Sequence, residues 1–205
     1  MSDLLSGLAG WATDVVESFG YVGVAMLITL ENVFPPLPSE LILPLAGFLA
    51  GQGRLSFVGA VSAATAGSLA GALILYAAAA WLGEARLRAI VERMPLVETA
   101  DVDRANEWFA RHGSSAVLIG RMVPVVRSLI SLPAGLNRMP IRRFVAYTAI
   151  GSGAWNVLLI GLGWILGDRW ELIRQWTQTL EWLVLGVLAG LVIWVVWRRL
   201  RTSQP

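Results

Sequence analysis

Two long stretches of the chain contain no charged side chain. The first runs from Leu55 to Gly83 and the second from Phe144 to Gly167. Crossing the hydrocarbon core of a bilayer takes about 20 consecutive apolar residues. Both stretches exceed that length, so each predicts a transmembrane helix. Together they indicate an integral membrane protein.

Two further segments are long and apolar enough to predict spans, at about 13–32 and 177–197. The first follows residues 2–18, where apolar and acidic positions mix in the pattern of an amphipathic helix. Residues 84–112 are rich in arginine and acidic residues, which predicts an amphipathic connector at the cytoplasmic surface. The sequence therefore predicts four spans.

Two other apolar segments are interrupted by proline. Pro35, Pro36 and Pro38 cannot continue a helix, because proline lacks a backbone N–H and restricts the residue before it. The apolar run that follows, Leu41–Gly51, is too short to cross a bilayer. We therefore expect a re-entrant hairpin at about 33–53.

The second interrupted segment, at about 113–137, is broken by Pro124 and Pro133 and predicts a second re-entrant hairpin. Leu41–Gly47 and Leu129–Gly135 are similar in sequence, and each precedes a long span. Inverted repeats with broken helices are typical of transporters. The interpretation is an inverted repeat.

Arginines near the ends of the spans predict the orientation. Arg198, Arg199 and Arg201 favour a cytoplasmic C-terminus. With four spans, the N-terminus is then also cytoplasmic, Arg54 lies outside, and the hairpins enter from opposite faces. The predicted fold is all-α: one polytopic membrane domain over 1–205, with four transmembrane helices and two opposed re-entrant helical hairpins in an inverted repeat.

Composition agrees with this class and excludes others. Hydrophobic residues make up 56% of the chain and charged residues 15%, against about 25% charged in a typical soluble domain. There is no cysteine for a disulfide and one histidine, His112, so we expect no histidine-based metal site and no cofactor. A net charge of +2 gives no reason to expect nucleic acid as a partner. Acidic residues among the first twenty predict that there is no cleavable signal peptide.

Four charged residues fall within the apolar and hairpin segments: Glu31, Glu40, Arg121 and Arg127. Each charge at the centre of a membrane helix costs about 2.5–3.5 kcal/mol. We therefore expect the two glutamates to neutralise the two arginines across the repeat interface. Such pairs could simply join the hairpins. Apolar hairpins would pack without them at a lower desolvation cost, which favours a functional site.

The chemistry of these four residues favours anion recognition coupled to protons. Arginine offers a planar, permanently charged fork that suits phosphate oxygens. A buried glutamate that exchanges its arginine for a phosphate-bearing substrate loses a cationic partner and takes up a proton. On this hypothesis, Glu40→Gln abolishes the pH dependence of transport.

The proline-containing motifs themselves resemble a known family. Glu31–Glu40 and Gly120–Arg127, followed by Pro133–Gly135 and Met139, are similar to the DedA family, also called SNARE-associated or VTT-domain proteins. The resemblance covers about residues 20–170. It implies paired re-entrant hairpins and lipid transport driven by the proton motive force in the bacterial cytoplasmic membrane.

The resemblance also implies roles for single residues. The acidic pair required in the family falls on Glu31 and Glu40, and the arginine pair on Arg121 and Arg127. Residues expected to shape the hairpins are Pro35, Pro36, Pro38, Ser39, Pro124, Pro133 and Gly135. Asn156 and Arg143 are expected accessory residues. The role of Arg143 comes from its position and not from the resemblance: it is expected to be a topology determinant that also guides anionic head groups.

The form of the first motif, with Leu43–Gly47 and Trp155–Asn156, is most similar to the branch that recycles undecaprenyl phosphate. A sister activity moves phosphatidylethanolamine, and the sequence does not separate the two well. The expected partners are a membrane lipid and protons, and a homodimer is one assembly that the sequence permits.

Two other classes of function remain open at this point. A lipid phosphatase would need several histidines, and His112 stands alone at a loop edge. An exporter of small cations would bind its substrate at the glutamates and use the arginines structurally, and a non-transporting scaffold belongs to the same class. The tryptophans, Trp155 among them, are ascribed mostly to anchoring at the membrane interface.

Overall fold

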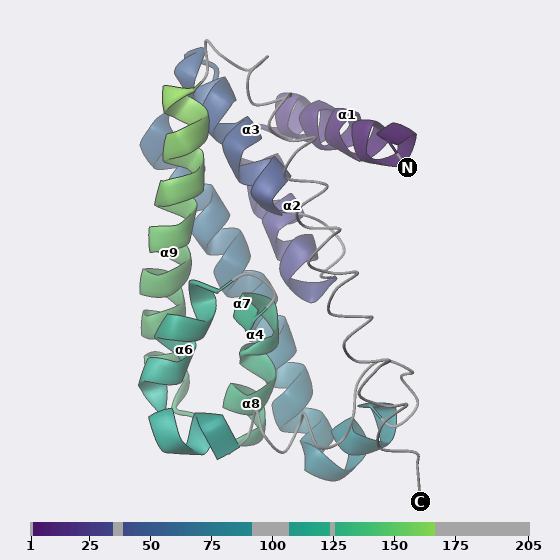
Figure 1. The fold of residues 1–205 in the computed structure, drawn as a ribbon, viewed down its shortest axis with the longest axis vertical. Coiled ribbons are helices and arrows are strands. Elements are labelled where there is room, and N and C mark those ends of the chain that lie inside the picture. The colour runs from purple at the N-terminus through teal and green to yellow at the C-terminus, as the bar shows by residue number, and fades with distance from the viewer. Residues whose placement is uncertain (1, 35–38, 92–106, 124–125, 167–205) are drawn as a thin grey trace, which may run out of the picture. The chain divides into compact units, whose positions relative to one another are not determined.

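The computed structural model describes residues 2–34, 39–91, 107–123 and 126–166 of the 205-residue chain (Figure 1). The chain divides into Met1–Gly167 and Asp168–Pro205, and every described residue belongs to the first unit. The predicted span at 177–197 and the C-terminal arginines lie outside the described residues. So do four of the prolines that the sequence analysis singled out: Pro35, Pro36, Pro38 and Pro124.

The described part of the chain is helical and contains no strand, so the predicted all-α class is confirmed there. Two helices are long and apolar enough to cross a membrane by length and composition, α4 (Phe57–Val91) and α9 (Ile141–Ile165). They match the two predicted spans that have no charged side chain. The spanning window of α4 ends at Leu87.

The predicted span at 13–32 is two helices instead of one. Helix α1 (Ser2–Phe19) corresponds to the expected amphipathic helix, and α2 (Tyr21–Val33) follows after a break at Gly20. Gly20 has a φ of 56°, a conformation that glycine adopts without the steric cost of a Cβ. The 13 residues of α2 extend about 20 Å at 1.5 Å per residue, short of the ~30 Å bilayer core. This segment therefore supplies no full span.

Helix α2 is instead the first arm of a helical pair. The chain turns back after α2 and returns as α3 (Ser39–Gly51), so the two helices lie side by side (Figure 1). The first pair therefore covers 21–51, where 33–53 was expected. Where the hairpin at 113–137 was predicted, the structure has a second helical pair. Its first arm is α6 (Ser114–Arg121), and its second arm consists of the short helices α7 (Val126–Leu129) and α8 (Ser131–Leu136).

The long helices hold the two pairs in a reciprocal way. Helix α4 packs against α2 and α8, α9 packs against α3 and α6, and the two long helices pack against each other. Exchanging α2 with α6, α3 with α8 and α4 with α9 leaves this pattern unchanged. It is the packing that an inverted repeat would produce. Helix α4 also contacts α3, so it touches both arms of the first pair.

Glycines allow these helices to approach closely. A methyl group on Gly47 of α3 would collide with the carbonyl oxygen of Ile160 on α9, and one on Gly163 would collide with that of Pro44. On α4, Gly67 and Gly71 lie against Ala25 and Asn32 of α2. The small residues thus fix the positions of α2 and α3 against the long helices.

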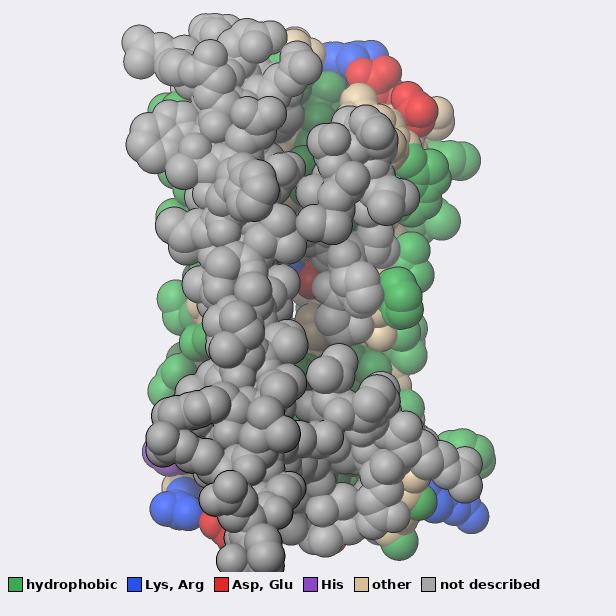
Figure 2. All heavy atoms as spheres, turned by 45° about the vertical axis from the view of Figure 1, so that its right-hand side comes forward, with side chains coloured by type: hydrophobic (Ala, Val, Ile, Leu, Met, Phe, Trp, Pro, Cys, Tyr) green, Lys and Arg blue, Asp and Glu red, His purple; other side chains and the backbone are tan. Residues whose placement is uncertain are grey.

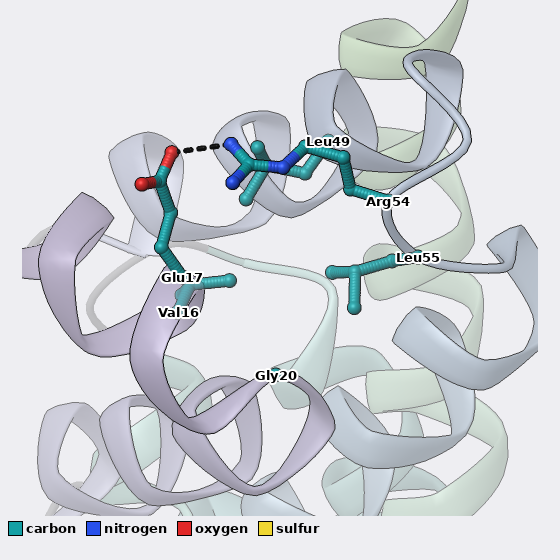
Figure 3. A pocket seen from close by; sticks show the side chains of 6 residues that line it. All are labelled: Val16, Glu17, Gly20, Leu49, Arg54 and Leu55. Atoms are coloured by element: carbon teal, nitrogen blue, oxygen red, sulfur yellow. Dashed lines mark hydrogen bonds and ion pairs between the residues drawn. The ribbon is translucent and has the colours of Figure 1, made fainter.

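The helix α1 and the turn before α4 lie at the same end of the bundle. Arg54 Nη1 donates a hydrogen bond to Glu17 Oε1 at 2.6 Å, beside a small cavity (Figure 3). The cavity is lined by Val16, Glu17, Gly20, Leu49, Arg54 and Leu55. The expectation that a span separates the N-terminal helix from Arg54 is therefore wrong. Because α3 runs back alongside α2, the turn before α4 lies at the same end of the bundle as α1.

On the face of the molecule drawn in Figure 2, charged and hydrophobic side chains occupy different regions. Charged side chains gather at the two ends, and hydrophobic side chains cover most of the described surface between them. Exposed apolar residues on the long helices include Val58, Ile74, Ile150 and Ile165. A surface apolar at its middle and charged at its ends suits a protein embedded in lipid.

Candidate functional site

Arg121 is enclosed where the two helical pairs meet. It ends α6 and is 1% exposed. Its Nη1 donates to Asn32 Oδ1 at 3.1 Å and also to the backbone carbonyl of Arg127, and its Nη2 donates to Ser131 Oγ at 2.6 Å. All three acceptors are uncharged. The guanidinium therefore joins α2 to both arms of the second pair.

Arg127 lies nearby on α7 but has different partners. Its Nη2 donates to the Glu31 carboxylate of α2 and to the Ser39 hydroxyl at the start of α3. The side chain is 11% exposed, and the ring of Trp155 lies 6.0 Å from its guanidinium carbon. Of the two buried arginines, Arg127 is thus the one that forms an ion pair and has the more exposed side chain.

Asn32 connects the two arginines through Glu31. Its Nδ2 lies 3.3 Å from Glu31 Oε2 and 3.0 Å from the carbonyl oxygen of Ile28, while its Oδ1 accepts from Arg121. The result is a continuous buried chain, Arg121–Asn32–Glu31–Arg127. The sequence analysis missed Asn32, although an amide inside an apolar helix and next to Glu31 was a usable signal. It also missed Ser131, which only the tertiary contact identifies.

Glu40 does not join this buried chain. It is exposed in the first turn of α3 and makes no ion pair with the described residues. The expectation that both glutamates neutralise the arginines is therefore met by Glu31 alone. The physical reason is helical geometry: Glu40 directly follows the buried Ser39, and neighbouring positions on a helix point in different directions.

The buried groups carry unequal charge. Among the described residues, the buried charged side chains are Arg121, Arg127 and Glu31, which contribute two positive charges and one negative charge when ionised. Burial in a medium of low dielectric makes such an imbalance costly. An anionic group entering beside Arg127 would reduce the imbalance, whereas a cation would increase it.

The remaining predicted residues fall outside the charged chain. Asn156 of α9 donates to Thr65 Oγ1 of α4 at 3.2 Å, so it joins the long helices. Arg143 is exposed in the first turn of α9. Pro133 and Gly135 are buried in α8, and Gly135 lies against the carbonyl of Tyr76 on α4. These contacts give Asn156, Pro133 and Gly135 a packing role.

The described ranges offer no clear group for metal binding outside the charged chain. No group of three or more His, Cys, Asp or Glu that could hold a metal is present within the described ranges. His112 is exposed, and its Nδ1 lies 2.9 Å from the carbonyl oxygen of Trp108. None of the four predicted charged residues lines the cavity of Figure 3.

Comparison with known families places this geometry in context. Residues 37–165, more than half of the chain, match the model of the VTT domain. The chain belongs to the VTT-domain family, also called the DedA family. The resemblance inferred from the proline-containing motifs is thereby confirmed. The matched range contains Glu40, Arg121 and Arg127, whereas Glu31 lies just before it.

The names of the curated relatives of this VTT-domain protein include a phosphatase-like protein and a transporter. An alkaline phosphatase-like protein of Lactococcus lactis subsp. cremoris is 39% identical over 183 residues, covering 87% of this chain and 86% of the relative. Undecaprenyl phosphate transporter A of Staphylococcus aureus is 37% identical over 185 residues, covering 89% and 91%. The Bacillus subtilis protein of that name is 29% identical over 204 residues, covering 97% of each chain. No solved structure matches the chain.

Proposed function

We propose that this VTT-domain protein moves undecaprenyl phosphate across the bacterial cytoplasmic membrane. One observation carries the proposal: Arg127 lies at the contact of two helical pairs, held by a carboxylate and a hydroxyl, in a buried group with an excess positive charge. A phosphate can take the place of a carboxylate on a guanidinium, because each presents two anionic oxygens that can accept hydrogen bonds from the same guanidinium fork. The names of the two transporter relatives support the same substrate.

The proposal includes a membrane architecture. The arms of both pairs are too short to cross a bilayer, and residues at the ends of these arms meet at the buried charges, so we assign them as re-entrant hairpins of an inverted repeat. With the C-terminus cytoplasmic, the spans are α4, α9 and 177–197. Helix α1 then lies at the outer surface with Arg54, which reverses the expected location of the N-terminus.

Single-cysteine labelling tests this topology cleanly, because the chain has no cysteine. In intact spheroplasts, a membrane-impermeant thiol reagent should label Arg54→Cys and Ser2→Cys, and should not label Arg142→Cys. Labelling of Arg54→Cys without Ser2→Cys would contradict the shared location of α1 and the turn before α4.

The proposed exchange uses the two arginines differently. A phosphate head group displaces the Glu31 carboxylate from Arg127, and Glu31 then takes up a proton because it has lost its cation. Asn32 remains hydrogen-bonded beside it. Arg121 keeps its three neutral acceptors and holds the two hairpins in place, so we give it a positioning role instead of the expected phosphate contact.

Flipping in proteoliposomes tests the substrate. Wild type should move a polyprenyl phosphate and leave phosphatidylethanolamine unmoved. Arg127→Ala should reduce movement to background, and Arg142→Ala, which changes an exposed arginine at the start of α9, should not. Equal movement of both lipids would favour the sister activity. Movement of neither lipid by folded protein would overturn the proposal.

Proton coupling has its own test. Glu31→Gln should remove the dependence of flipping on an imposed pH gradient, because glutamine cannot take up the proton. Glu40→Gln, at an exposed position of the same hairpin, shows whether the second glutamate takes part as the family resemblance implies. A full pH response in both variants would contradict proton coupling through these carboxylates.

One relative's name favours a second candidate, a phosphatase acting on a lipid phosphate. It predicts release of inorganic phosphate from polyprenyl phosphate, whereas a transporter leaves the ester intact. We expect no release. A minor role for Arg143 in guiding head groups has a similar simple test: unchanged transport and topology in Arg143→Lys would leave it only a topological role.

A further inference from the structure

The ring of Trp155, whose indole N–H has no hydrogen-bond partner among the described residues, lies near Arg127. Trp155 belongs to α9, ten residues before that helix ends at Ile165, so it is not at the interface where tryptophan anchoring was expected. Its Nε1 is buried and has no hydrogen-bond partner among the described residues. The guanidinium carbon of Arg127 lies 6.0 Å from its ring centre.

The same face of α9 lines both buried arginines. Phe144 lies 5.9 Å from the guanidinium carbon of Arg121, a methyl group on Gly151 would contact the Arg121 side chain, and Trp155 lies by Arg127. Residues spaced by three or four positions lie on one face of a helix. The unpartnered indole N–H is therefore part of the wall around the charged chain.

The chemistry of the missing partner is restricted. An indole N–H can only donate, so the partner must be an acceptor. Buried donors in proteins are almost always hydrogen-bonded, and exceptions call for a specific explanation. Because a permanent cation is adjacent and the buried charges sum to an excess positive charge, an anionic oxygen suits the position better than a neutral one.

We propose that Trp155 Nε1 and Arg127 together bind the phosphate oxygens of the substrate. This inference rests on the proposed function and deepens it. When phosphate replaces Glu31 on Arg127, one of its oxygens accepts the indole N–H, while the ring keeps its position against the guanidinium. The substrate class is a lipid phosphomonoester, whose three free oxygens can meet both the guanidinium fork and the indole. A phosphodiester has two free oxygens and carries less charge.

The test compares Trp155→Phe with wild type and with Trp164→Phe, a change at an exposed tryptophan of the same helix. Phenylalanine keeps an aromatic face for Arg127 and removes the N–H together with part of the ring, so the melting of each variant is measured beside its activity. Purified proteins in proteoliposomes are assayed with a polyprenyl monophosphate and with the anionic diester phosphatidylglycerol. We expect Trp155→Phe to weaken monophosphate binding about tenfold, as for one hydrogen bond to a charged group, and to change diester handling less than about twofold. Trp164→Phe should match wild type.

The monoester-to-diester ratio separates recognition from folding. Equal losses for both lipids, or an unchanged ratio in a variant that melts like wild type, would overturn the role of Trp155. If wild type binds and moves no polyprenyl phosphate, the proposed function itself fails, which is a different result. A further experiment adds inorganic phosphate as a competitor of the polyprenyl monophosphate. Competition that is weaker in Trp155→Phe supports recognition of the phosphate group, and equal competition in both proteins contradicts it.

Discussion

Two arginines six residues apart have different surroundings at the contact of the helical pairs. Arg121 donates only to uncharged acceptors and is 1% exposed, whereas Arg127 donates to a carboxylate and a hydroxyl and has a side chain that is 11% exposed. A cation held by neutral dipoles has no counter-ion to exchange. One held by a carboxylate can exchange it for another anion. The comparison thus assigns structure to one arginine and ligand exchange to the other.

The two helical pairs contribute complementary groups to this contact. The first pair supplies the carboxylate, amide and hydroxyl of Glu31, Asn32 and Ser39, and the second supplies both guanidinium groups. Neither pair can satisfy its own buried charges. Assembly of the charged chain therefore requires both pairs to be docked on the long helices.

The largest expected effect is the loss of Arg121. Arg121→Ala leaves the Asn32 and Ser131 side chains and the Arg127 carbonyl without their shared donor and opens a cavity, so we expect about 3–5 kcal/mol of destabilisation. Chemical denaturation in detergent measures it, with Arg142→Ala as an exposed control. A stable but inactive Arg121→Ala protein would instead indicate contact with the substrate.

The ion pair of Arg127 separates stability from function. Arg127→Gln leaves the Glu31 carboxylate buried without a cation, which we expect to cost about 3 kcal/mol. The double variant Glu31→Gln, Arg127→Gln removes the unpaired charge and should recover most of that stability without recovering flipping. Denaturation and flipping assays on all four proteins measure both effects. Recovered flipping in the double variant would show that Arg127 only neutralises Glu31.

Asn32 should matter less than either arginine and more than a distant amide. Asn32→Ala removes hydrogen bonds to Arg121, Glu31 and Ile28, and we expect about 2 kcal/mol of destabilisation with slower flipping. Asn156→Ala is the matched control. It loses one bond to Thr65 and should cost about 1 kcal/mol with flipping unchanged. Equal effects on flipping would argue against a special role for the charged chain.

The smallest effect is expected at the exposed ion pair between α1 and the turn before α4. Glu17→Gln should change stability by less than about 1 kcal/mol, because both partners are well exposed and screened. The difference between wild type and variant should shrink further in high salt. A loss comparable to that of Arg121→Ala would show that α1 contributes to the hairpin contact.

Much of the architecture could be predicted from the sequence because it depends on local patterns. Long runs without charge identified α4 and α9, and proline-interrupted apolar segments indicated where short helices pack in pairs. The break at Gly20 could not be predicted in this way. Apolar residues continue on both sides of it, and only the positive φ of one glycine separates α1 from α2.

The sequence by itself determined that four charged residues in apolar segments need partners, since unpaired charge is costly in a membrane protein. The tertiary structure decided which charges meet. Glu31 and Arg127 are 96 positions apart, and Arg121 reaches Asn32 across 89 positions, distances over which residue patterns specify no contact. The packing of both pairs on α4 and α9 sets those contacts. It encloses Arg121, keeps Glu40 outside, and places Arg127 beside the ring of Trp155.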